Sequence, residues 1–311
     1  MNLILCYTPL QVLIAEKIIE RYPTENFYGV MLCSVNNAKF EYYRERLAQK
    51  CQHFFSFIQR TDRIGLFKQI LCLKYQFHRK KFDNVFIASI NDIQMQFILS
   101  SIRFDTLYTF DDGTANIVPS SVYYQPEVNT PIRRNINKYL RNKFNAEKIK
   151  KCAQLHYTIY PQFTNIIKNT AYIDLSHSSS FEGKKKDAAI NILLGQPVYL
   201  DNDKNIELAN GVIKRFNIDY YLPHPREQYQ LENVTYINTP LIFEDYISQQ
   251  TTDKQFRIYT YFSSAVLNVM SNSNLDIYAL RINVDKQEYL ECYELFEKVG
   301  INIIDITEDS K

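Results

Sequence analysis

The sequence predicts an α/β protein with two parallel sheets, each in its own domain. Short apolar runs alternate with amphipathic runs of helical length through the first half of the 311 residues. The alternation stops at a polar, lysine-rich stretch over residues 176–187 and then starts again. Strand–helix alternation is typical of a parallel sheet covered by helices on both faces. We therefore expect two Rossmann-like domains that face a central cleft, residues 1–185 and residues 186–311.

The first domain is expected to begin with a buried strand, followed by a helix that Pro9 opens, since proline is tolerated in a first helical turn. The expected helices are residues 9–19, 40–47 and 93–102. The expected strands are residues 3–7, 27–32, 54–58, 84–88 and 106–110.

The second domain repeats this pattern after the stretch at 176–187, which has the composition of an interdomain linker. Its expected strands are residues 189–194, 220–222, 234–237, 256–261, 276–282 and 301–304. Its expected helices are residues 206–216 and 287–299.

Composition excludes several classes of protein. The 36 basic and 34 acidic residues leave a formal net charge of +2. A dedicated nucleic-acid-binding protein usually carries a strongly basic field, so we expect no nucleic-acid partner. None of the six cysteines forms a C-x-x-C pair or a zinc-ligand spacing, which indicates a reduced, cytoplasmic protein. No apolar run approaches the ~20 residues of a membrane-spanning helix, so we expect any membrane association to be peripheral.

The usual nucleotide-binding motifs are missing. No two of the seven glycines have the G-x-G spacing of a dinucleotide site, and no G-K-[ST] loop occurs. A G-x-S-x-G nucleophile elbow is absent as well. The remaining possibility is a protein that binds a nucleotide through helix N-termini and side chains, as two-domain glycosyltransferases do.

Four segments carry polar residues near the carboxyl ends of expected strands, where open α/β sheets bind their ligands. They are Phe110-Asp111-Asp112-Gly113-Thr114, Leu194-Gly195-Gln196-Pro197 with Asp201-Asn202-Asp203, Pro223-His224-Pro225-Arg226, and Tyr261-Phe262-Ser263-Ser264-Ala265.

An Asp-Asp-Gly segment, a His-Pro segment and a late Ser-Ser segment, in this order, resemble the bacterial lipooligosaccharide sialyltransferases, glycosyltransferase family 52. The amino-terminal segment, residues 2–8 with Gln11, also resembles this family, as do residues 193–195 and 244–246. The resemblance covers nearly the whole chain. It implies a GT-B-type architecture, a CMP-sialic acid donor, inversion at the anomeric carbon and no cofactor or metal.

His224 is the candidate general acid. The leaving group is a CMP phosphate oxygen, and an imidazole with an unperturbed pKa of ~6.5 can protonate it near neutral pH. Arg226 could pair with the phosphate or with the sialic acid carboxylate. The alternative for His224 is a capping or packed histidine.

The acceptor hydroxyl needs a base, and the resemblance places that base after the Leu-Gly-x-Pro turn, at Asp201 or Asp203. We prefer Asp201. Asp111 and Asp112 are the other candidates for the base, because a similar Asp-Asp-Gly serves as base in another group of bacterial sialyltransferases. Alternatively, these two residues form a turn that caps a helix. Asp201-Asn202-Asp203 also matches a D-x-D metal motif, but Asp203 could simply cap the next helix, and we expect no metal site.

The resemblance also implies the substrate-binding residues. Ser263 and Ser264 would hold the CMP phosphate, Glu244 the ribose hydroxyls, and Gly195 would let the backbone approach the nucleotide. Each has a structural alternative. The serines could cap a helix, Glu244 could be an acidic residue in a first helical turn, and Gly195 could be a turn glycine. The whole expected set is Gln11, Asp111, Gly195, Gln196, Pro225, Arg226, Glu244, Tyr261, Ser263 and Ser264, with Tyr7 and Thr8 as further acceptor-side residues.

A basic stretch runs through Arg133, Arg134, Lys138, Arg141, Lys143, Lys148, Lys150 and Lys151. It could meet an anionic membrane or a lipid-linked acceptor, or be a solvated helix face. The expected partners are CMP-sialic acid and a galactose-terminated lipooligosaccharide acceptor, with α-2,3 linkage, peripheral contact at the cytoplasmic face of the inner membrane and a homodimer as further expectations. The alternatives are a GT-B transferase with another nucleotide-sugar donor, or a non-catalytic glycan-binding protein.

Overall fold

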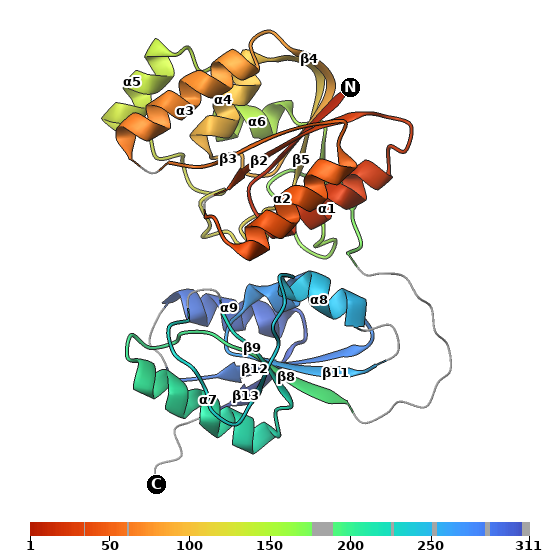
Figure 1. Cartoon of the computed structure of the whole chain (residues 1–311), viewed down its shortest axis with the longest axis vertical. Coiled ribbons are helices and arrows are strands. Elements are labelled where there is room, and N and C mark those ends of the chain that lie inside the picture. The colour runs from red at the N-terminus through yellow and green to blue at the C-terminus, as the bar shows by residue number, and fades with distance from the viewer. Residues whose placement is uncertain are drawn as a thin grey trace. The chain divides into compact units, whose positions relative to one another are not determined.

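The computed structural model describes residues 1–33, 35–60, 62–175, 189–224, 227–250, 254–283 and 287–306. The chain divides into two compact units, Met1–Leu175 and Ser176–Lys311 (Figure 1). The expected linker at 176–187 and the expected domain boundary after residue 185 lie outside the described residues. The boundary, and a cleft between the two domains, stay predictions.

The first unit is a parallel sheet with the strand order β3-β2-β1-β4-β5-β6-β7. Its strands are β1 (Asn2–Cys6), β2 (Phe27–Cys33), β3 (His53–Ile58), β4 (Lys81–Ile87), β5 (Arg103–Phe110), β6 (Leu155–Thr158) and β7 (Thr170–Tyr172). Its helices are α1 (Pro9–Glu20), α2 (Ala38–Lys50), α3 (Arg63–Gln76), α4 (Ile93–Ser101), α5 (Pro131–Tyr139) and α6 (Ala146–Cys152).

Local sequence explains where these helices begin. The Thr8 side chain accepts a hydrogen bond from the backbone N–H of Gln11 at the start of α1, and Pro9 is the first helical residue, as expected. Asp92 caps α4 in the same way through the N–H of Met95. Each cap satisfies a backbone donor that has no partner within the helix.

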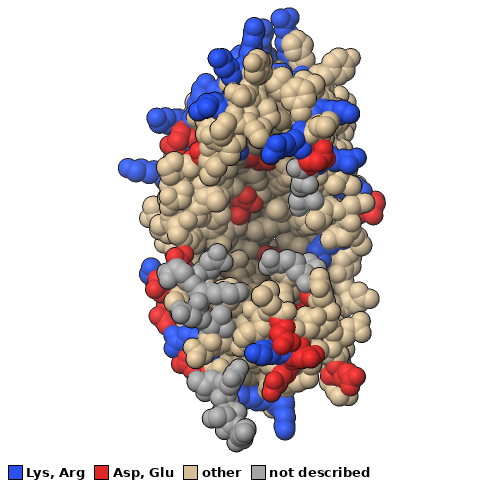
Figure 2. All heavy atoms as spheres, turned by 90° about the vertical axis from the view of Figure 1, so that its left-hand side faces the viewer, with Lys and Arg blue, Asp and Glu red and all other residues tan. Residues whose placement is uncertain are grey.

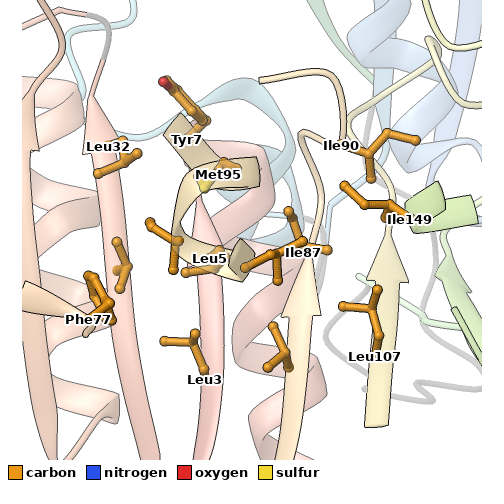
Figure 3. Close-up of a cluster of buried hydrophobic side chains, with 14 of the residues drawn as sticks. Leu3, Leu5, Tyr7, Leu32, Phe77, Ile87, Ile90, Met95, Leu107 and Ile149 are labelled. Carbon is orange, nitrogen blue, oxygen red and sulfur yellow. The ribbon is translucent and has the colours of Figure 1, made fainter. Parts of the chain in front are cut away.

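Alternate residues of the central strand β1 define the core of the first unit (Figure 3). Leu3, Leu5 and Tyr7 point to the face that α3, α4 and α6 cover, where they pack with residues such as Phe77 and Met95. Figure 1 shows α1 and α2 on the opposite face. This two-sided burial explains why β1 reads as a continuous apolar run rather than an alternating one.

The second unit is also a parallel sheet, with the strand order β10-β9-β8-β11-β12-β13. Its strands are β8 (Ile190–Leu194), β9 (Tyr220–Leu222), β10 (Thr235–Tyr236), β11 (Phe256–Thr260), β12 (Leu275–Arg281) and β13 (Asn302–Asp305). Its helices are α7 (Asn202–Phe216), α8 (Phe243–Gln250), the 3-10 helix η1 (Ser264–Val269) and α9 (Gln287–Lys298). Figure 1 shows α7 on one face of this sheet and α8 and α9 on the other.

Each sheet has one point where the strand order reverses direction. In the first unit it lies between β1 and β4, and in the second between β8 and β11. The loops that leave such a pair of strands diverge to opposite faces, so they leave a crevice at the carboxyl edge where α/β proteins bind ligands. The two candidate sites described next lie at these points.

Candidate functional site

The reversal point of the second sheet brings two expected segments together. Gly195 and Gln196 follow β8, and residues 261–264 follow the neighbouring strand β11. The Gln196 side-chain oxygen accepts hydrogen bonds from the Thr260 hydroxyl at 3.2 Å and from the Phe262 N–H at 3.0 Å. Gln196 is 9% exposed, so its main contribution is to tie the two loops together.

His224 follows β9, on the other side of β8, and lies in a turn that Glu227 closes. The N–H of Glu227 donates to the carbonyl oxygen of His224 at 2.9 Å. In return, the Glu227 carboxylate accepts the N–H of His224 at 3.3 Å. These reciprocal bonds fix the backbone from which the imidazole projects. Pro225 and Arg226, between these two residues, lie outside the described residues, so their expected contacts are still predictions.

The Glu227 carboxylate is anchored to the sheet by Tyr221 of β9, whose hydroxyl donates to it at 2.7 Å. A Cβ atom on Gly195 would lie 2.2 Å from the Tyr221 hydroxyl oxygen and 2.7 Å from the Glu227 carboxylate. Residue 195 must therefore be glycine because this pair packs against it. That reason differs from the expected one, a close approach to the nucleotide.

Burial raises the pKa of Glu227, although the hydrogen bonds from Tyr221, His224 and Tyr229 act in the opposite direction. Burial also raises the pKa of Tyr229 to about 12 and that of Tyr221 further. The protonated form of Glu227 is therefore favoured relative to a solvated glutamate.

Two buried polar atoms beside this turn have no hydrogen-bond partner among the described residues, the second carboxylate oxygen of Glu227 and the Tyr261 hydroxyl. Tyr261 is only 2% exposed, and its pKa is raised, first by burial and also by the neighbouring Tyr229. A hydroxyl this deep leaves little surface for the substrate contact expected of Tyr261.

Asp201 and Asp203 lie where the β8 connection enters α7. Asp201 is the cap of α7, and its side chain accepts the N–H of Asp203 at 2.9 Å. The cap is thus Asp201 and not Asp203. Both side chains are exposed, and the Asp201 carboxylate accepts no hydrogen bond from another described residue. An exposed carboxylate with a free oxygen can accept a proton.

A buried asparagine that the sequence did not single out shapes the loop before Asp201. The Asn205 side-chain oxygen accepts the N–H groups of Val198 and Tyr199, each at 2.9 Å. Its amide donates to the carbonyls of Tyr199 and Asp201 at 2.9 and 3.0 Å. Asn205 therefore holds Asp201 in place.

Ser263 caps η1, and its hydroxyl accepts the N–H of Ala265 at 3.4 Å. Ser264 is exposed at the first position of this short helix. Glu244, in the first turn of α8, is 7% exposed and accepts a hydrogen bond from Asn268 of η1 at 2.6 Å. The structure therefore places α8 beside the serine segment, with the Glu244 carboxylate largely turned into the protein.

In the first unit, Asp112 lies at the reversal point between β1 and β4. Its carboxylate accepts hydrogen bonds from the Tyr123 hydroxyl at 2.5 Å, from the Ser89 hydroxyl at 3.2 Å and from the Gln11 amide. Both oxygens are engaged, and the side chain is partly exposed. A carboxylate that is held in this way can accept a hydrogen bond from a substrate hydroxyl or pair with a cationic group.

Gln11 is fully buried, and its expected contact with the acceptor stays a prediction. Its side-chain oxygen accepts the N–H of Tyr7 at 2.6 Å, and its amide donates to Ser89 and Asp112. These bonds position the Asp112 carboxylate. Tyr7 is also largely buried and donates to Asp92 at 3.0 Å, a carboxyl whose pKa burial raises.

Asp111 is fully buried among hydrogen-bond donors, and its expected role as base or substrate contact stays a prediction. Its carboxylate has no exposed surface and lies 2.8 Å from the His156 ring nitrogen. It also accepts hydrogen bonds from Thr158, the N–H of Ile159 and Asn165. These contacts join β5 to β6 and to the loop beyond it. Asp112 is therefore the residue of the pair that a substrate can reach.

No group of three or more His, Cys, Asp or Glu side chains in the described ranges could hold a metal ion. Asp201-Asn202-Asp203 supplies two exposed carboxylates in one turn of α7 and no third ligand of these types among them. His224 and Asp201 follow the neighbouring strands β9 and β8, and histidine and carboxylate are residue types that acid–base chemistry uses.

Sequence reasoning missed the residues that hold the site, chiefly Tyr221, Glu227, Asn205, Ser89 and Tyr123. One of them, Glu227, could have been found from the sequence, because a glutamate three residues after His224 can accept the N–H of His224 through its side chain. Ser89 and Tyr123 reach Asp112 from distant parts of the chain, and no local pattern announces such contacts.

Comparisons with known proteins identify the family and the fold. The model of glycosyltransferase family 52 matches residues 24–284. A protein of Pasteurella multocida named CMP-N-acetylneuraminate:beta-galactoside alpha-2,3-sialyltransferase is 53% identical over 99% of this chain and 100% of its own length. A Haemophilus influenzae protein named N-acetyllactosaminide alpha-2,3-sialyltransferase is 36% identical over 97% of this chain and 99% of its own length.

Solved structures show the same fold at low sequence identity. An Arabidopsis thaliana glycosyltransferase in complex with UDP-L-rhamnose matches all of this chain and 86% of its own with a TM-score of 0.56 and 11% identity. The glycosyltransferase SnogD from Streptomyces nogalater matches all of this chain and 88% of its own with a TM-score of 0.55 and 8% identity. The fold is GT-B, as predicted, and the chain belongs to glycosyltransferase family 52.

Proposed function

We propose that this protein is an inverting sialyltransferase that moves sialic acid from CMP-sialic acid to a terminal galactose of lipooligosaccharide or lipopolysaccharide, with α-2,3 linkage. The observation that carries this proposal is the 53% identity, over essentially both whole chains, to the Pasteurella multocida protein with that donor, acceptor and linkage in its name. The strand-end histidine and carboxylates supply the chemistry that such a transfer needs.

His224 is the proposed general acid. The bond between the anomeric carbon of sialic acid and the CMP phosphate oxygen breaks, and the imidazolium gives its proton to that oxygen as it leaves. A group in this role must be held in one direction, and the turn closed by Glu227 supplies that constraint on the backbone of His224.

Asp201 is the proposed general base. It takes the proton of the galactose hydroxyl while that oxygen forms a bond to the anomeric carbon on the face opposite to CMP, which inverts the configuration. Asp111 has no accessible oxygen, and both oxygens of Asp112 already accept hydrogen bonds, whereas the exposed Asp201 accepts one.

A set of three conservative variants tests this assignment. Asn caps a helix as well as Asp does, so Asp201→Asn keeps the cap of α7 while it removes the base. We expect it to lower kcat by about a hundredfold or more. Asp203→Asn is the matched control, and a loss of that size in Asp112→Asn with full activity in Asp201→Asn would move the base to the first unit.

Donor binding needs no metal in this proposal. Arg226 and the hydroxyls of Ser263 and Ser264 would neutralise and hold the phosphate, and Pro225 is proposed as a further substrate-binding residue. Glu244, which is 7% exposed, would accept hydrogen bonds from the ribose hydroxyls. Full turnover in EDTA is the expected result, and restoration of lost turnover by added Mg²⁺ or Mn²⁺ would contradict it.

The acceptor side is proposed to lie at the Asp112 site of the first unit, which offers a partly exposed carboxylate for hydroxyl groups. The acceptor is lipid-linked, so peripheral contact with the cytoplasmic face of the inner membrane belongs to the proposal. No helix within the described ranges is long and apolar enough to span a bilayer. A homodimer stays a prediction.

The experiment that tests the function offers CMP-sialic acid and UDP-hexoses separately, with lactose as acceptor. We expect sialyl-lactose from CMP-sialic acid alone, and we expect an α-2,3-specific sialidase to cleave it. Transfer from a UDP-hexose without transfer from CMP-sialic acid would replace the donor in this proposal.

A further inference from the structure

Leu200 is the most exposed large apolar side chain in the described part of the chain. It is 105% exposed, whereas Leu290 of α9 and Leu71 of α3 are each 42% exposed. A single apolar side chain at the surface is ordinary, so its exposure alone indicates no function. The place of Leu200 is informative, because it directly precedes Asp201, the proposed base.

The loop that carries Leu200 is held by hydrogen bonds on both sides of it. Val198 is buried in the core of the second unit, and Tyr199 packs against the same cluster. The Asn205 side chain accepts the N–H groups of Val198 and Tyr199 and donates to the carbonyls of Tyr199 and Asp201. The Leu200 side chain therefore extends into solvent from a backbone that is fixed before and after it.

Leu200 and Asp201 are exposed side by side, since the Cα atoms of consecutive residues are about 3.8 Å apart. A base must come within roughly 2.6–3.2 Å of the hydroxyl that it deprotonates. A sugar whose hydroxyl reaches the Asp201 carboxylate therefore also comes within reach of the leucine. Ligand sites combine apolar contacts of this kind with a few polar groups that fix the orientation of the ligand.

We propose that Leu200 is a specificity-determining residue that packs against the apolar face of the acceptor galactose. In β-galactose the 4-hydroxyl is axial, so the hydrogens on C3, C4 and C5 form one apolar patch beside the reacting 3-hydroxyl. In β-glucose the 4-hydroxyl is equatorial, which breaks this patch. Contact with the patch removes apolar surface of both partners from water. The inference rests on the proposed function through the role of Asp201 as base.

The charges around Leu200 favour a neutral sugar. Asp201 and Asp203 are exposed at the start of α7, and Lys204 follows them. Figure 2 shows acidic and basic side chains interspersed on the second unit. An anionic group would meet two carboxylates, which is unfavourable. An acyl chain would cover the leucine but bring no hydroxyl to Asp201, whereas galactose supplies both the hydroxyl and the apolar patch.

Steady-state kinetics with lactose test the contact. We expect Leu200→Ser to raise KM for lactose by about fivefold or more and to keep kcat within about threefold, because the contact holds substrate and transition state alike. KM for CMP-sialic acid should stay within about twofold. Leu200→Met keeps an apolar side chain of similar volume and should restore KM to within about twofold of the wild type. Leu290→Ser, on α9, is the matched control.

Saturation-transfer NMR tests the contact without turnover. Methyl β-galactoside and methyl β-glucoside are each added to the protein in the presence of CMP. We expect the wild type to transfer magnetisation most strongly to the galactoside hydrogens on C3, C4 and C5, and less to those of the glucoside. These signals should fall about threefold or more in Leu200→Ser and be retained in Leu200→Met and Leu290→Ser. Unfolding by urea should be unchanged in Leu200→Ser, because an exposed side chain contributes little to stability.

An unchanged KM for lactose in Leu200→Ser, or ring signals that do not depend on Leu200, would overturn the proposal. A lower free energy of unfolding in Leu200→Ser would overturn it as well, since another part of the chain would then cover the leucine. With octyl β-lactoside, a loss of signal from the octyl chain alone would overturn it in favour of a contact with the aglycone. Ring signals that depend on Leu200 support the contact even if CMP-sialic acid is not turned over, in which case the proposed function alone fails.

Discussion

The carboxylate of Glu227 accepts the backbone N–H of His224 at 3.3 Å, while the N–H of Glu227 donates to the carbonyl of His224 at 2.9 Å. Tyr221 donates to the same carboxylate oxygen at 2.7 Å, so the turn is anchored to strand β9. Hydrogen bonds therefore fix the backbone of His224, the proposed acid, at both its N–H and its carbonyl group. Glu227 acts through His224 and is a positioning residue.

Two replacements of Glu227 distinguish the hydrogen bonds that its side-chain oxygen accepts from the negative charge that it carries. Glu227→Gln keeps a side-chain oxygen that can accept both hydrogen bonds, so we expect kcat within about threefold of the wild type. Glu227→Ala removes the acceptor, and we expect kcat to fall about tenfold or more with little change in KM for the donor. Equal kcat values for the two variants, measured by CMP release, would show that the turn does not depend on this oxygen.

The pKa of Glu227 makes stability depend on pH. Because burial raises its folded-state pKa, its contribution is fully present below the unfolded pKa of about 4.3 and is lost as pH rises through the folded pKa. Glu227→Gln removes this loss. The free energy of unfolding of the variant relative to the wild type should therefore increase from pH 5 to pH 8 in urea titrations. A difference that stays constant, or decreases, with pH would contradict the raised pKa.

Two glycines of the second unit should respond in opposite ways to the same change. Gly195→Ala places a methyl group 2.2 Å from the Tyr221 hydroxyl oxygen, which must move and take the Glu227 turn with it. We expect a loss of stability of about 2 kcal/mol and at least a tenfold loss of kcat. Gly211→Ala meets no atom within 4 Å and lies inside α7, so it should gain about 1 kcal/mol at unchanged kcat. Urea unfolding and CMP release check both, and an active, stable Gly195→Ala would contradict the close packing.

Two buried tyrosines form a second matched pair. Tyr221 donates to Glu227, whereas the Tyr261 hydroxyl has no partner among the described residues. Tyr221→Phe should cost about 1–2 kcal/mol, since it leaves a buried carboxylate oxygen with one donor fewer. Tyr261→Phe should leave the free energy of unfolding within about 0.5 kcal/mol or raise it. Equal losses in thermal unfolding would mean that Tyr261 has a partner of its own.

The sequence predicted the sheets more completely than the helices. Every predicted strand corresponds to an observed strand, because buried parallel strands are continuous apolar runs. Helix α3 was not predicted, since its residues 63–76 carry apolar side chains on both the buried and the exposed face and so lack one clear stripe. The short strands β6 and β7 and the short helix α6 were not predicted either.

The sequence predicted that the candidate residues follow strands, but it did not predict the contacts among them. Residues such as Gly195, His224 and Ser263 do lie at the carboxyl ends of their strands. The contacts that hold them come from burial and from side chains distant in the chain, as Gln11 and Tyr123 do for Asp112. Contacts of this kind also bury Asp111 and Gln11, and no local sequence pattern predicts that burial.

The most direct test of the account compares wild type with His224→Ala in CMP-sialic acid turnover, with a lactose-type acceptor and EDTA present. His78→Ala, an exposed histidine of the first unit, is the matched control. We expect sialyl-lactose from the wild type and from the control, and a loss of kcat of about a hundredfold or more in His224→Ala, with unfolding by urea unchanged. Unchanged turnover in His224→Ala would contradict the account, because the transfer would then proceed without the acid that the Glu227 turn positions.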